Sequence, residues 1–412
     1  MYKFVKPFSA LRPHTQYASS VIAPPYDVVS EDEARTILDA SPNSFLGVSR
    51  PEAGIPKGVH SDSNKIHTEA KKNLQKLITQ KLLVRDEKPA YYIYKMKMGQ
   101  HEQTGIALTV SVDSYNDNQV KKHELTRPLK EDDRTQNMLS LNTQTGPVLT
   151  VNRANSKLKD LLASAKKTSP LLEVKGQHDV IHTIWKVDNL SMVEAITTSF
   201  EEMHCIYIAD GHHRSAAAAR VSGELRTSSS CATDSFNYFL TVVFPHDEMK
   251  IFDYNRVVTD LNGLSINTML SILSDEFDIK PTAKPIKPNR PGVFGMCIAN
   301  QWYELTMHSE LFPMDDPVAS LDVSLLQDRI LSPILGVGDP RTDPRLDFVG
   351  GIRGLEELER LVFSKQYAAA FSLYPTSMEQ LMSVADAGKL MPPKSTWFEP
   401  KLADGLLSHV LD

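Results

Sequence analysis

The sequence predicts an α+β protein, with mixed sheets in two lobes around a cleft. Its 412 residues are enough for two to three domains. The 41% hydrophobic and 23% charged residues are ordinary for a globular chain. Short β-branched apolar runs and helical segments follow one another along the whole sequence. We place an N-terminal lobe at residues 1–259 and a C-terminal lobe at residues 260–412.

The first part of the N-terminal lobe predicts a proline-rich loop, two helices and a hairpin. The first helix begins near Ser30, because Ser30 and Glu33 have the spacing of a capping box. A second helix is expected over residues 62–83. The segments 90–98 and 106–113 have strand composition around a polar turn, which predicts the hairpin.

The rest of this lobe alternates short strands with helices. Pro128 predicts the start of a helix, and Gly146-Pro147 predicts its end. The apolar run CIYIA at 205–209 predicts a strand, which a tight turn connects to an alanine-rich helix. The run NYFLTVVF at 237–244 predicts a buried strand.

The C-terminal lobe is expected to begin at about residue 260, with a helix that a linker follows. We predict a helix over 264–277 and a linker in the proline-rich segment 280–292. A hairpin around Asn300 follows. The remaining segments predict three helices, one strand and an extended loop, in LDVSLLQDRILSPIL, LEELERLVF, SMEQLMSVADAG, QYAAAFSLYP and MPPKSTWFEPK respectively.

Charge and composition exclude several classes of protein. With 45 basic and 51 acidic residues, the net charge of −6 argues against a broad nucleic-acid surface. No apolar run approaches the ~18 residues of a membrane span, and the N-terminus lacks the core of a signal peptide. The three cysteines form no metal or disulfide pattern. We therefore expect a cytoplasmic protein without a membrane partner.

The sharpest chemical motif is Asp210-Gly211-His212-His213-Arg214, between the strand and the alanine-rich helix. A helix N-terminus offers unpaired N–H groups to phosphate, and Gly211 permits close approach of the backbone. Arg214 could grip an oxyanion, and a histidine could exchange a proton. Asp210 is the candidate ligand for Mg²⁺. In a purely structural alternative, Asp210 caps the helix and Arg214 is a surface charge.

The two histidines do not predict a zinc site. Adjacent helical side chains point about 100° apart, so His212 and His213 cannot both face one metal ion. We favour a phosphate-binding role for His212 and a catalytic role for His213.

The second motif is Lys-His-Glu at 122–124, followed by two cations on one helix face. Glu124 or His123 could act as a general base. Lys130 and Arg134 are four residues apart, so they could hold a phosphate together. The alternative is a solvated, salt-bridged start of a helix.

Three further loops carry polar groups. In the extended loop, Lys394, Ser395 and Thr396 could bind an anion, and the aromatic residues that follow could stack on a base, although packing into the core is the alternative. The Pro-Pro-Tyr-Asp loop at 24–27 could line a cleft. The glycine-rich segment 350–354 could approach phosphate, but it is not a Walker A loop.

Four of these segments together resemble the bacterial family called domain of unknown function 1015: APPYDVVS, KKHELTRPLKEDDR, IADGHHRSAAAA and MPPKSTWFEPKL. The Gly211–Arg214 turn is also similar to the signature of the ParB/sulfiredoxin superfamily, where this turn binds nucleotide phosphates. Free-serine kinases of that superfamily use a glutamate to activate the serine hydroxyl. The resemblance implies a ParB/sulfiredoxin-like core, phosphate or Mg²⁺ contacts at Asp210–Arg214, and an acid/base role for Glu124.

The leading hypothesis is therefore a nucleotide-dependent phosphotransferase that acts on a small hydroxy amino acid, with Mg²⁺ and ATP or ADP as cofactors. The same cleft could instead hydrolyse phosphoserine, with a histidine as a transient phosphohistidine. A third possibility is a non-catalytic nucleotide-binding regulator in the manner of ParB. The absence of a helix-turn-helix pattern argues against a role on DNA.

Overall fold

The computed structural model describes residues 3–56, 63–228 and 235–412. The chain divides into two compact units. Unit 1 comprises Met1–Met249 and Pro400–Asp412, and unit 2 comprises Lys250–Glu399. Both contain helices and sheets, which confirms the predicted α+β class. The expected boundary at 259/260 falls inside unit 2, and the last segment of the chain belongs to unit 1.

Unit 1 is built on a nine-stranded mixed sheet, in the order β6-β11-β8-β12-β5-β4-β10-β9 with β1 paired to β5. Most neighbours are antiparallel, but β11 runs parallel to β6, and β12 runs parallel to β8. The strands are β1 (Val5–Lys6), β4 (Tyr91–Met98), β5 (His101–Ser111), β6 (Val120–Lys121), β8 (Val148–Asn152), β9 (Leu172–Lys175), β10 (Ile181–Val187), β11 (Ile206–Asp210) and β12 (Tyr238–Pro245).

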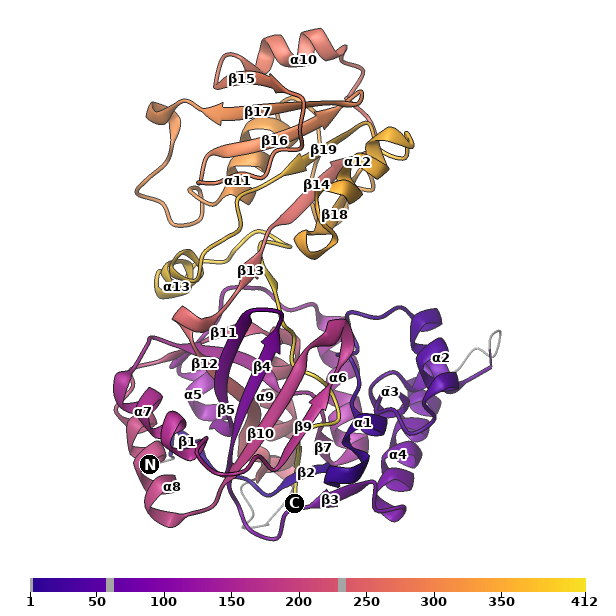
Figure 1. The fold of residues 1–412 in the computed structure, drawn as a ribbon, viewed down its shortest axis with the longest axis vertical. Helices are drawn as coiled ribbons and strands as arrows, with labels where there is room; N and C mark the ends of the chain where they lie inside the picture. Colours follow the sequence, from indigo (N-terminus) through magenta and orange to yellow (C-terminus); the bar gives the residue numbers. More distant parts are fainter. Residues whose placement is uncertain (1–2, 57–62, 229–234) are drawn as a thin grey trace. The chain divides into compact units, whose positions relative to one another are not determined.

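A second sheet of unit 1 joins the two ends of the chain. Its order is β3-β2-β21-β7, and β21 pairs antiparallel with both β2 and β7. In Figure 1 the yellow C-terminal segment runs back into the indigo and magenta unit 1. The strands are β2 (Ala10–Pro13), β3 (Leu83–Arg85), β7 (Thr143–Gln144) and β21 (Ser408–Val410).

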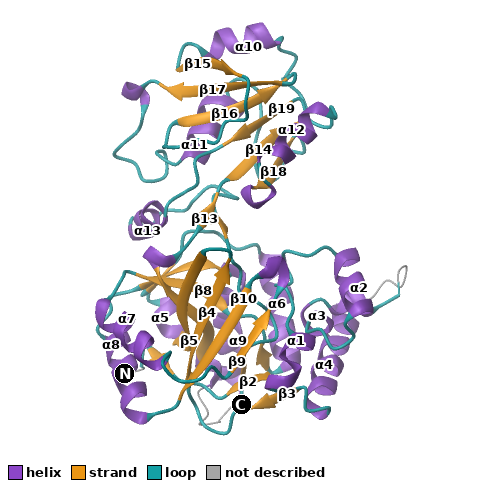
Figure 2. Ribbon diagram, in the orientation of Figure 1, coloured by secondary structure: helices purple, strands orange, loops and turns teal. Residues whose placement is uncertain are grey.

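The helices of unit 1 cover the sheets in separate groups, as Figure 2 shows. One hydrophobic cluster joins β4, β5 and β12 to α8 and α9, through residues such as Leu108, Phe200 and Val221. Another lies among α1 to α4. The helices are α1 (Ala18–Val21), α2 (Glu31–Ala40), α3 (Leu46–Ser49), α4 (Ser63–Thr79), α5 (Val112–Asn116), α6 (Pro128–Leu141), α7 (Ser156–Ala165), α8 (Leu190–Glu201) and α9 (His212–Ser228).

The helix signals of the sequence hold at several ends. Ser30 and Glu33 form the expected capping box at the start of α2. Pro128 begins α6, but the helix ends before Gly146, because Asn142 adopts a left-handed conformation with φ of 50°. The expected start of the second helix at residue 62 lies outside the described residues. Its expected end at 83 is wrong, because Leu83 begins β3.

Unit 2 contains a six-stranded antiparallel sheet in the order β15-β17-β16-β19-β14-β18 and a two-stranded pair, β13-β20. The strands are β13 (Ile251–Phe252), β14 (Tyr254–Val258), β15 (Phe277–Thr282), β16 (Val293–Ile298), β17 (Gln301–Met307), β18 (Leu346–Gly350), β19 (Ala369–Ser372) and β20 (Trp397–Phe398). The helices are α10 (Ile266–Leu273), α11 (Asp322–Leu326), α12 (Leu355–Phe363) and α13 (Met378–Asp386).

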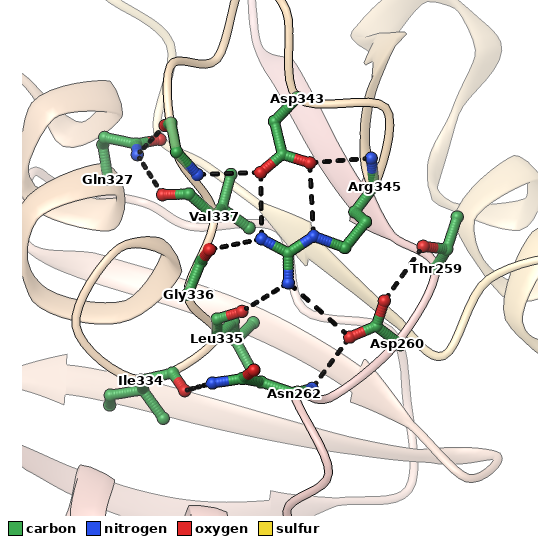
Figure 3. Close-up of polar contacts among 11 residues, drawn as sticks. Thr259, Asp260, Asn262, Gln327, Ile334, Leu335, Gly336, Val337, Asp343 and Arg345 are labelled. Carbon is green, nitrogen blue, oxygen red and sulfur yellow. Dashed lines mark hydrogen bonds and ion pairs between the residues drawn. The ribbon is translucent and has the colours of Figure 1, made fainter.

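The long connection from α11 to β18 is held by one arginine. Figure 3 shows Arg345 donating to both carboxylate oxygens of Asp343, at 2.9 and 3.2 Å, and to the carbonyls of Leu335 and Gly336. Asp260 adds a second carboxylate at 3.8 Å from the guanidinium. The predicted linker at 280–292 is partly strand, because β15 continues through Pro281 at the edge of the sheet.

Candidate functional site

The Asp-Gly-His-His-Arg motif forms the predicted strand–turn–helix. Strand β11 ends at Asp210, and α9 begins at His212. Between them Gly211 has φ of 100°, a conformation that L side chains rarely adopt. The N–H groups of Arg214 and Ser215 donate to the Gly211 carbonyl, at 2.9 and 3.1 Å. The turn thus places the N-terminus of a 17-residue helix at the end of a sheet strand.

The sheet brings the Lys-His-Glu segment to the same turn. Strands β6 and β11 are parallel neighbours, with Val120 opposite Ile206 and Lys121 opposite Tyr207. Parallel neighbours end at the same edge of a sheet, so the residues after β6 lie beside those that end β11. Helix α6, which follows the segment, packs on α9. Residues almost ninety positions apart therefore share one site.

Direct contacts join the two motifs. The Nδ1 atom of His212 lies 3.7 Å from Oε2 of Glu124. The backbone N–H of His123 points to Nε2 of His212 at 3.5 Å, and the two imidazole rings meet edge to face at 4.5 Å. The backbone N–H of Arg127 donates to Nε2 of His213 at 3.0 Å.

The three histidines are neutral bases. Burial lowers the pKa of His123 to about 4 and holds the pKa of His212 well below its usual value, where the neighbouring His123 adds to the effect. Burial and then Lys130 lower the pKa of His213. Because Nε2 of His213 accepts a hydrogen bond, its neutral ring carries the proton on Nδ1. By the same reasoning, His212 presents its Nδ1–H to Glu124.

Arg214 and Lys401 share the carboxylate of Asp210. The Arg214 guanidinium is buried and lies 3.3 Å from Oδ2 of Asp210, while the Lys401 ammonium lies 3.6 Å from the same oxygen. Arg214 also donates to the Pro147 carbonyl. Burial alone would raise the pKa of Asp210, but Lys401 and Arg214 hold it well below its usual range. One carboxylate oxygen thus lies between two cations at the start of a helix.

Asp404 is a second carboxyl beside Arg214. It is 2% exposed, and its Oδ2 is buried without a hydrogen-bond partner among the described residues. Gly146 leaves room between the two side chains, since a Cβ there would lie 3.3 Å from Oδ1 of Asp404 and 3.5 Å from Cδ of Arg214. Burial raises the pKa of Asp404 to about 7, with Asp27 adding to this effect and Arg214 opposing it.

The proline-rich loop lies against Arg134 of α6. The Arg134 guanidinium stacks 4.2 Å from the centre of the Tyr26 ring and pairs with Asp133. Burial would lower the pKa of Arg134, but Tyr26 and Asp133 raise it. Asp27 interacts electrostatically with Arg214. Lys130, on the first turn of α6, is exposed, and its positive charge helps to lower the pKa of His213.

The remaining predicted residues lie in unit 2. Lys394 is exposed, and the Ser395 hydroxyl donates to the Pro392 carbonyl. The carbonyl of Ser395 accepts from the hydroxyl of Thr376. Thr396 lies next to β20, in which Trp397 pairs with Phe252 of β13. These contacts hold the loop on its own unit.

The charge pairing of Asp210 bears on the predicted Mg²⁺ site. Its Oδ2 atom lies between Arg214 and Lys401, so a metal ion at this oxygen would meet two cations. Across residues 3–56, 63–228 and 235–412, no group of three or more histidine, cysteine, aspartate or glutamate side chains could hold a metal ion. In the same residues, no helix is both long and apolar enough to cross a bilayer.

Sequence reasoning did not single out Asp404, and it named Lys401 only as the end of a loop. Both follow β20 and precede β21, far from the other site residues in sequence. The pairing of β21 with β2 and β7 carries them into unit 1, and no local pattern signals that pairing. Asp27 was noted as a possible cleft residue, but its interaction with Arg214 depends on the fold.

Comparisons with known proteins give one family and several distant structures. The family model described as "Protein of unknown function (DUF1015)" matches residues 5–324. No curated protein matches the chain. A free serine kinase in complex with ADP is 12% identical, with 71% of this chain and 87% of that chain covered and a TM-score of 0.35. C-terminally truncated SbnI from Staphylococcus aureus is 11% identical, with 73% and 86% covered and a TM-score of 0.37. A conserved hypothetical protein from Pyrococcus furiosus is 13% identical, with 73% and 94% covered and a TM-score of 0.35.

Proposed function

The chain belongs to the DUF1015 family of proteins of unknown function, and we propose that unit 1 is a phosphotransferase. In this proposal it moves a phosphoryl group from a nucleotide, ATP or ADP, to the hydroxyl of a small amino acid, with serine as the first candidate. The observation that carries the proposal is the contact between His212 and Glu124. It joins an anion-binding helix N-terminus to a carboxylate that can accept a proton.

The phosphate grip is supplied by the start of α9 and its cations. Backbone N–H groups at a helix N-terminus and the helix dipole favour a phosphate. Asp210 already holds Arg214 and Lys401 at one oxygen, so both cations are in position for an incoming phosphate oxygen. Gly211 lets the phosphate approach the backbone, because it carries no side chain. Lys130 and Arg134 add positive charge on α6.

Glu124 is the proposed general base. As the serine Oγ–P bond forms, the bond from phosphorus to the bridging oxygen of the nucleotide breaks, and the hydroxyl proton passes to the Glu124 carboxylate. The nucleotide leaves with the bonding electrons of the broken bond. The Nδ1–H of His212 faces this carboxylate at 3.7 Å, and the neutral imidazole does not compete for the proton at pH 7. Glu124 is half-exposed, so a substrate can reach it.

The proposal is tested by phosphorus NMR of the full chain. Parallel samples contain serine with ATP, serine with ADP, and phosphoserine alone, each with and without Mg²⁺. We expect a phosphoserine signal in at least one serine sample, reduced about 100-fold or more in rate by Glu124→Gln, which is the typical effect of losing a general base. Glu202→Gln, an exposed glutamate of the same unit, is the matched control and should keep the wild-type rate.

Other outcomes separate the alternatives. Release of inorganic phosphate from phosphoserine alone would assign a phosphatase to the same site. Tight nucleotide binding without turnover of any sample would leave a nucleotide-binding regulator. Either result would reject the kinase assignment.

A further inference from the structure

We propose that unit 2 carries a separate oxyanion-binding site at Arg256 and Lys394, with a phosphate group as its ligand. This site is independent of the function proposed for unit 1. It is built on β14 and on the loop that precedes β20, and it includes Lys394, which the sequence predicts as an anion ligand.

Arg256 is a buried cation that lacks an acidic partner. It is 4% exposed, and its guanidinium lies 4.9 Å from the Phe348 ring centre. Its Nη2 donates to the carbonyls of Lys394 and Pro393, at 2.9 and 3.4 Å, and its Nη1 donates to the carbonyl of Tyr254. Within unit 2, all of whose residues the structure describes, no carboxylate forms an ion pair with it.

Arg345 is an arginine of the same unit with a structural role, and its surroundings differ from those of Arg256. Its guanidinium binds both oxygens of Asp343 and lies near Asp260, so its charge is compensated (Figure 3). These carboxylates raise the pKa of Arg345. At Arg256 the opposite holds, because burial lowers its pKa to about 9 and only Tyr254 opposes the effect. An uncompensated buried cation is unfavourable, and an anion would relieve it.

Lys394 brings a second cation to the same aromatic ring. Its ammonium lies 5.6 Å from the Tyr254 ring centre, and the Arg256 guanidinium lies 5.8 Å from that centre. Lys394 has φ of 58°, and its carbonyl accepts from Arg256, so the loop is tied directly to the arginine. Within unit 2 no carboxylate pairs with Lys394 either. Both cations therefore lie over the same aromatic ring without a carboxylate partner in unit 2, which favours a bound anion.

Phosphate fits the chemistry of these groups. A guanidinium presents a planar fork of donors that matches two phosphate oxygens, and a lysine adds a point charge. A guanidinium carries five N–H groups, and the Arg256 guanidinium makes three hydrogen bonds to the carbonyl oxygens described above. It therefore has further donors for an anion. The Trp397 indole packs edge to face on Tyr254 at 5.2 Å, which gives the site a rigid aromatic side.

The test follows the Arg256 guanidinium by NMR in the full chain labelled with ¹⁵N-arginine. The signal is assigned by its loss in Arg256→Lys. Inorganic phosphate is titrated at constant ionic strength, with sodium chloride as the balancing salt, and AMP is titrated in a second series. Because the signal belongs to one residue, phosphate bound at the site of unit 1 does not produce its shift.

We expect phosphate to shift the Arg256 signal in a saturable way, and we expect a Kd at least fivefold higher in Lys394→Gln. The matched control is Lys365→Gln, since Lys365 is also an exposed lysine of unit 2 with a left-handed backbone, at φ of 60°. Its Kd should equal that of the wild type. A stronger response to AMP than to phosphate would assign a nucleotide phosphate as the ligand.

The proposal is overturned if neither phosphate nor AMP changes the chemical shift of the Arg256 signal. It is also overturned if sodium chloride produces the same shift, or if Lys394→Gln binds phosphate with the wild-type Kd. Should Arg256→Lys fail to fold, thermal unfolding of the two lysine variants keeps the proposal testable. Phosphate must then raise the Tm of Lys365→Gln more than that of Lys394→Gln, and equal increases would contradict the site.

Discussion

At the scale of the residue, charge compensation decides what each group of the candidate site can do. Asp210 is held ionised by Lys401 and Arg214, whereas Asp404, beside the same arginine, has a pKa raised to about 7 by burial and Asp27. Two aspartates close to one guanidinium therefore titrate in different ranges. The first holds the cations in position, and the second exchanges a proton near neutral pH.

The raised pKa of Asp404 predicts how stability depends on pH. An aspartate in an unfolded chain has a pKa of about 3.9. Between that value and about 7 the folded chain binds one more proton than the unfolded chain, so stability falls as pH rises through this window. Asp404→Asn removes the effect. Relative to the variant, the wild type should lose on the order of 2 kcal/mol between pH 5 and pH 8.

Urea unfolding of both proteins at the two pH values measures this difference. The Asn side chain keeps the shape of Asp404 without a charge, so packing is matched. A difference between the two proteins that stays constant from pH 5 to pH 8 would show that Asp404 does not titrate there.

The sequence located the residues of the turn because their chemistry is local. Asp210, Gly211 and Arg214 stand between an apolar strand and a helix, and the structure has that strand–turn–helix. Glu124 was a candidate from its place in the Lys-His-Glu motif and from the resemblance to free-serine kinases, but its distance from His212 depends on the pairing of β6 with β11. Lys401 and Asp404 carry no local signal, because a strand at the far end of the chain positions them.

At the scale of the element, the N-terminus of α9 depends on one glycine. Gly211 has φ of 100°, and a Cβ there would lie 3.1 Å from Nε of Arg214. Gly211→Ala should therefore destabilise the protein by about 1–3 kcal/mol and weaken nucleotide binding. Gly223 is the control within the same helix, since a Cβ there meets nothing within 4 Å. Gly223→Ala should stabilise the protein by up to about 1 kcal/mol.

Chemical denaturation and a nucleotide titration of both variants check this pair. Equal stability changes at the two glycines would mean that the turn tolerates a side chain.

The positions of α2 and α6 were predictable from caps and prolines, which act within one turn of a helix. The strand through Pro281 was not predictable, because only its place at the edge of the sheet makes a proline acceptable.

At the scale of the whole molecule, unit 1 is completed by the end of the chain. The segment Pro400–Asp412 contributes β21, and Leu406, Leu407 and Leu411 are buried there. Burial of each leucine is worth about 1.5–3 kcal/mol, and a domain is stable by only about 5–15 kcal/mol. A chain that ends at Glu399 should therefore lose most of the stability of unit 1.

Lys401→Met separates this structural effect from the loss of the cation. The variant keeps β21 and the leucines, so it should lose only about 1–3 kcal/mol of stability, from the lost pairing of Lys401 with Asp210, which is less than the truncated chain loses. Its nucleotide affinity should fall about tenfold. Far-ultraviolet circular dichroism with urea and a nucleotide titration measure the two quantities. A truncated chain with wild-type stability would contradict the division of the molecule into these units.

The central claim is that the turn at Asp210–Arg214 and the segment at Glu124 act as one phosphoryl-transfer site. A double-mutant cycle on the rate of phosphoserine formation tests it most directly, with Glu124→Gln, His212→Gln and both together. His212→Gln keeps an acceptor for the His123 N–H but removes the Nδ1–H that faces Glu124. Because the two side chains act on the same proton transfer, we expect the double variant to be no slower than the slower single variant. Losses that multiply independently, or a wild-type protein that forms no phosphoserine, would contradict the account.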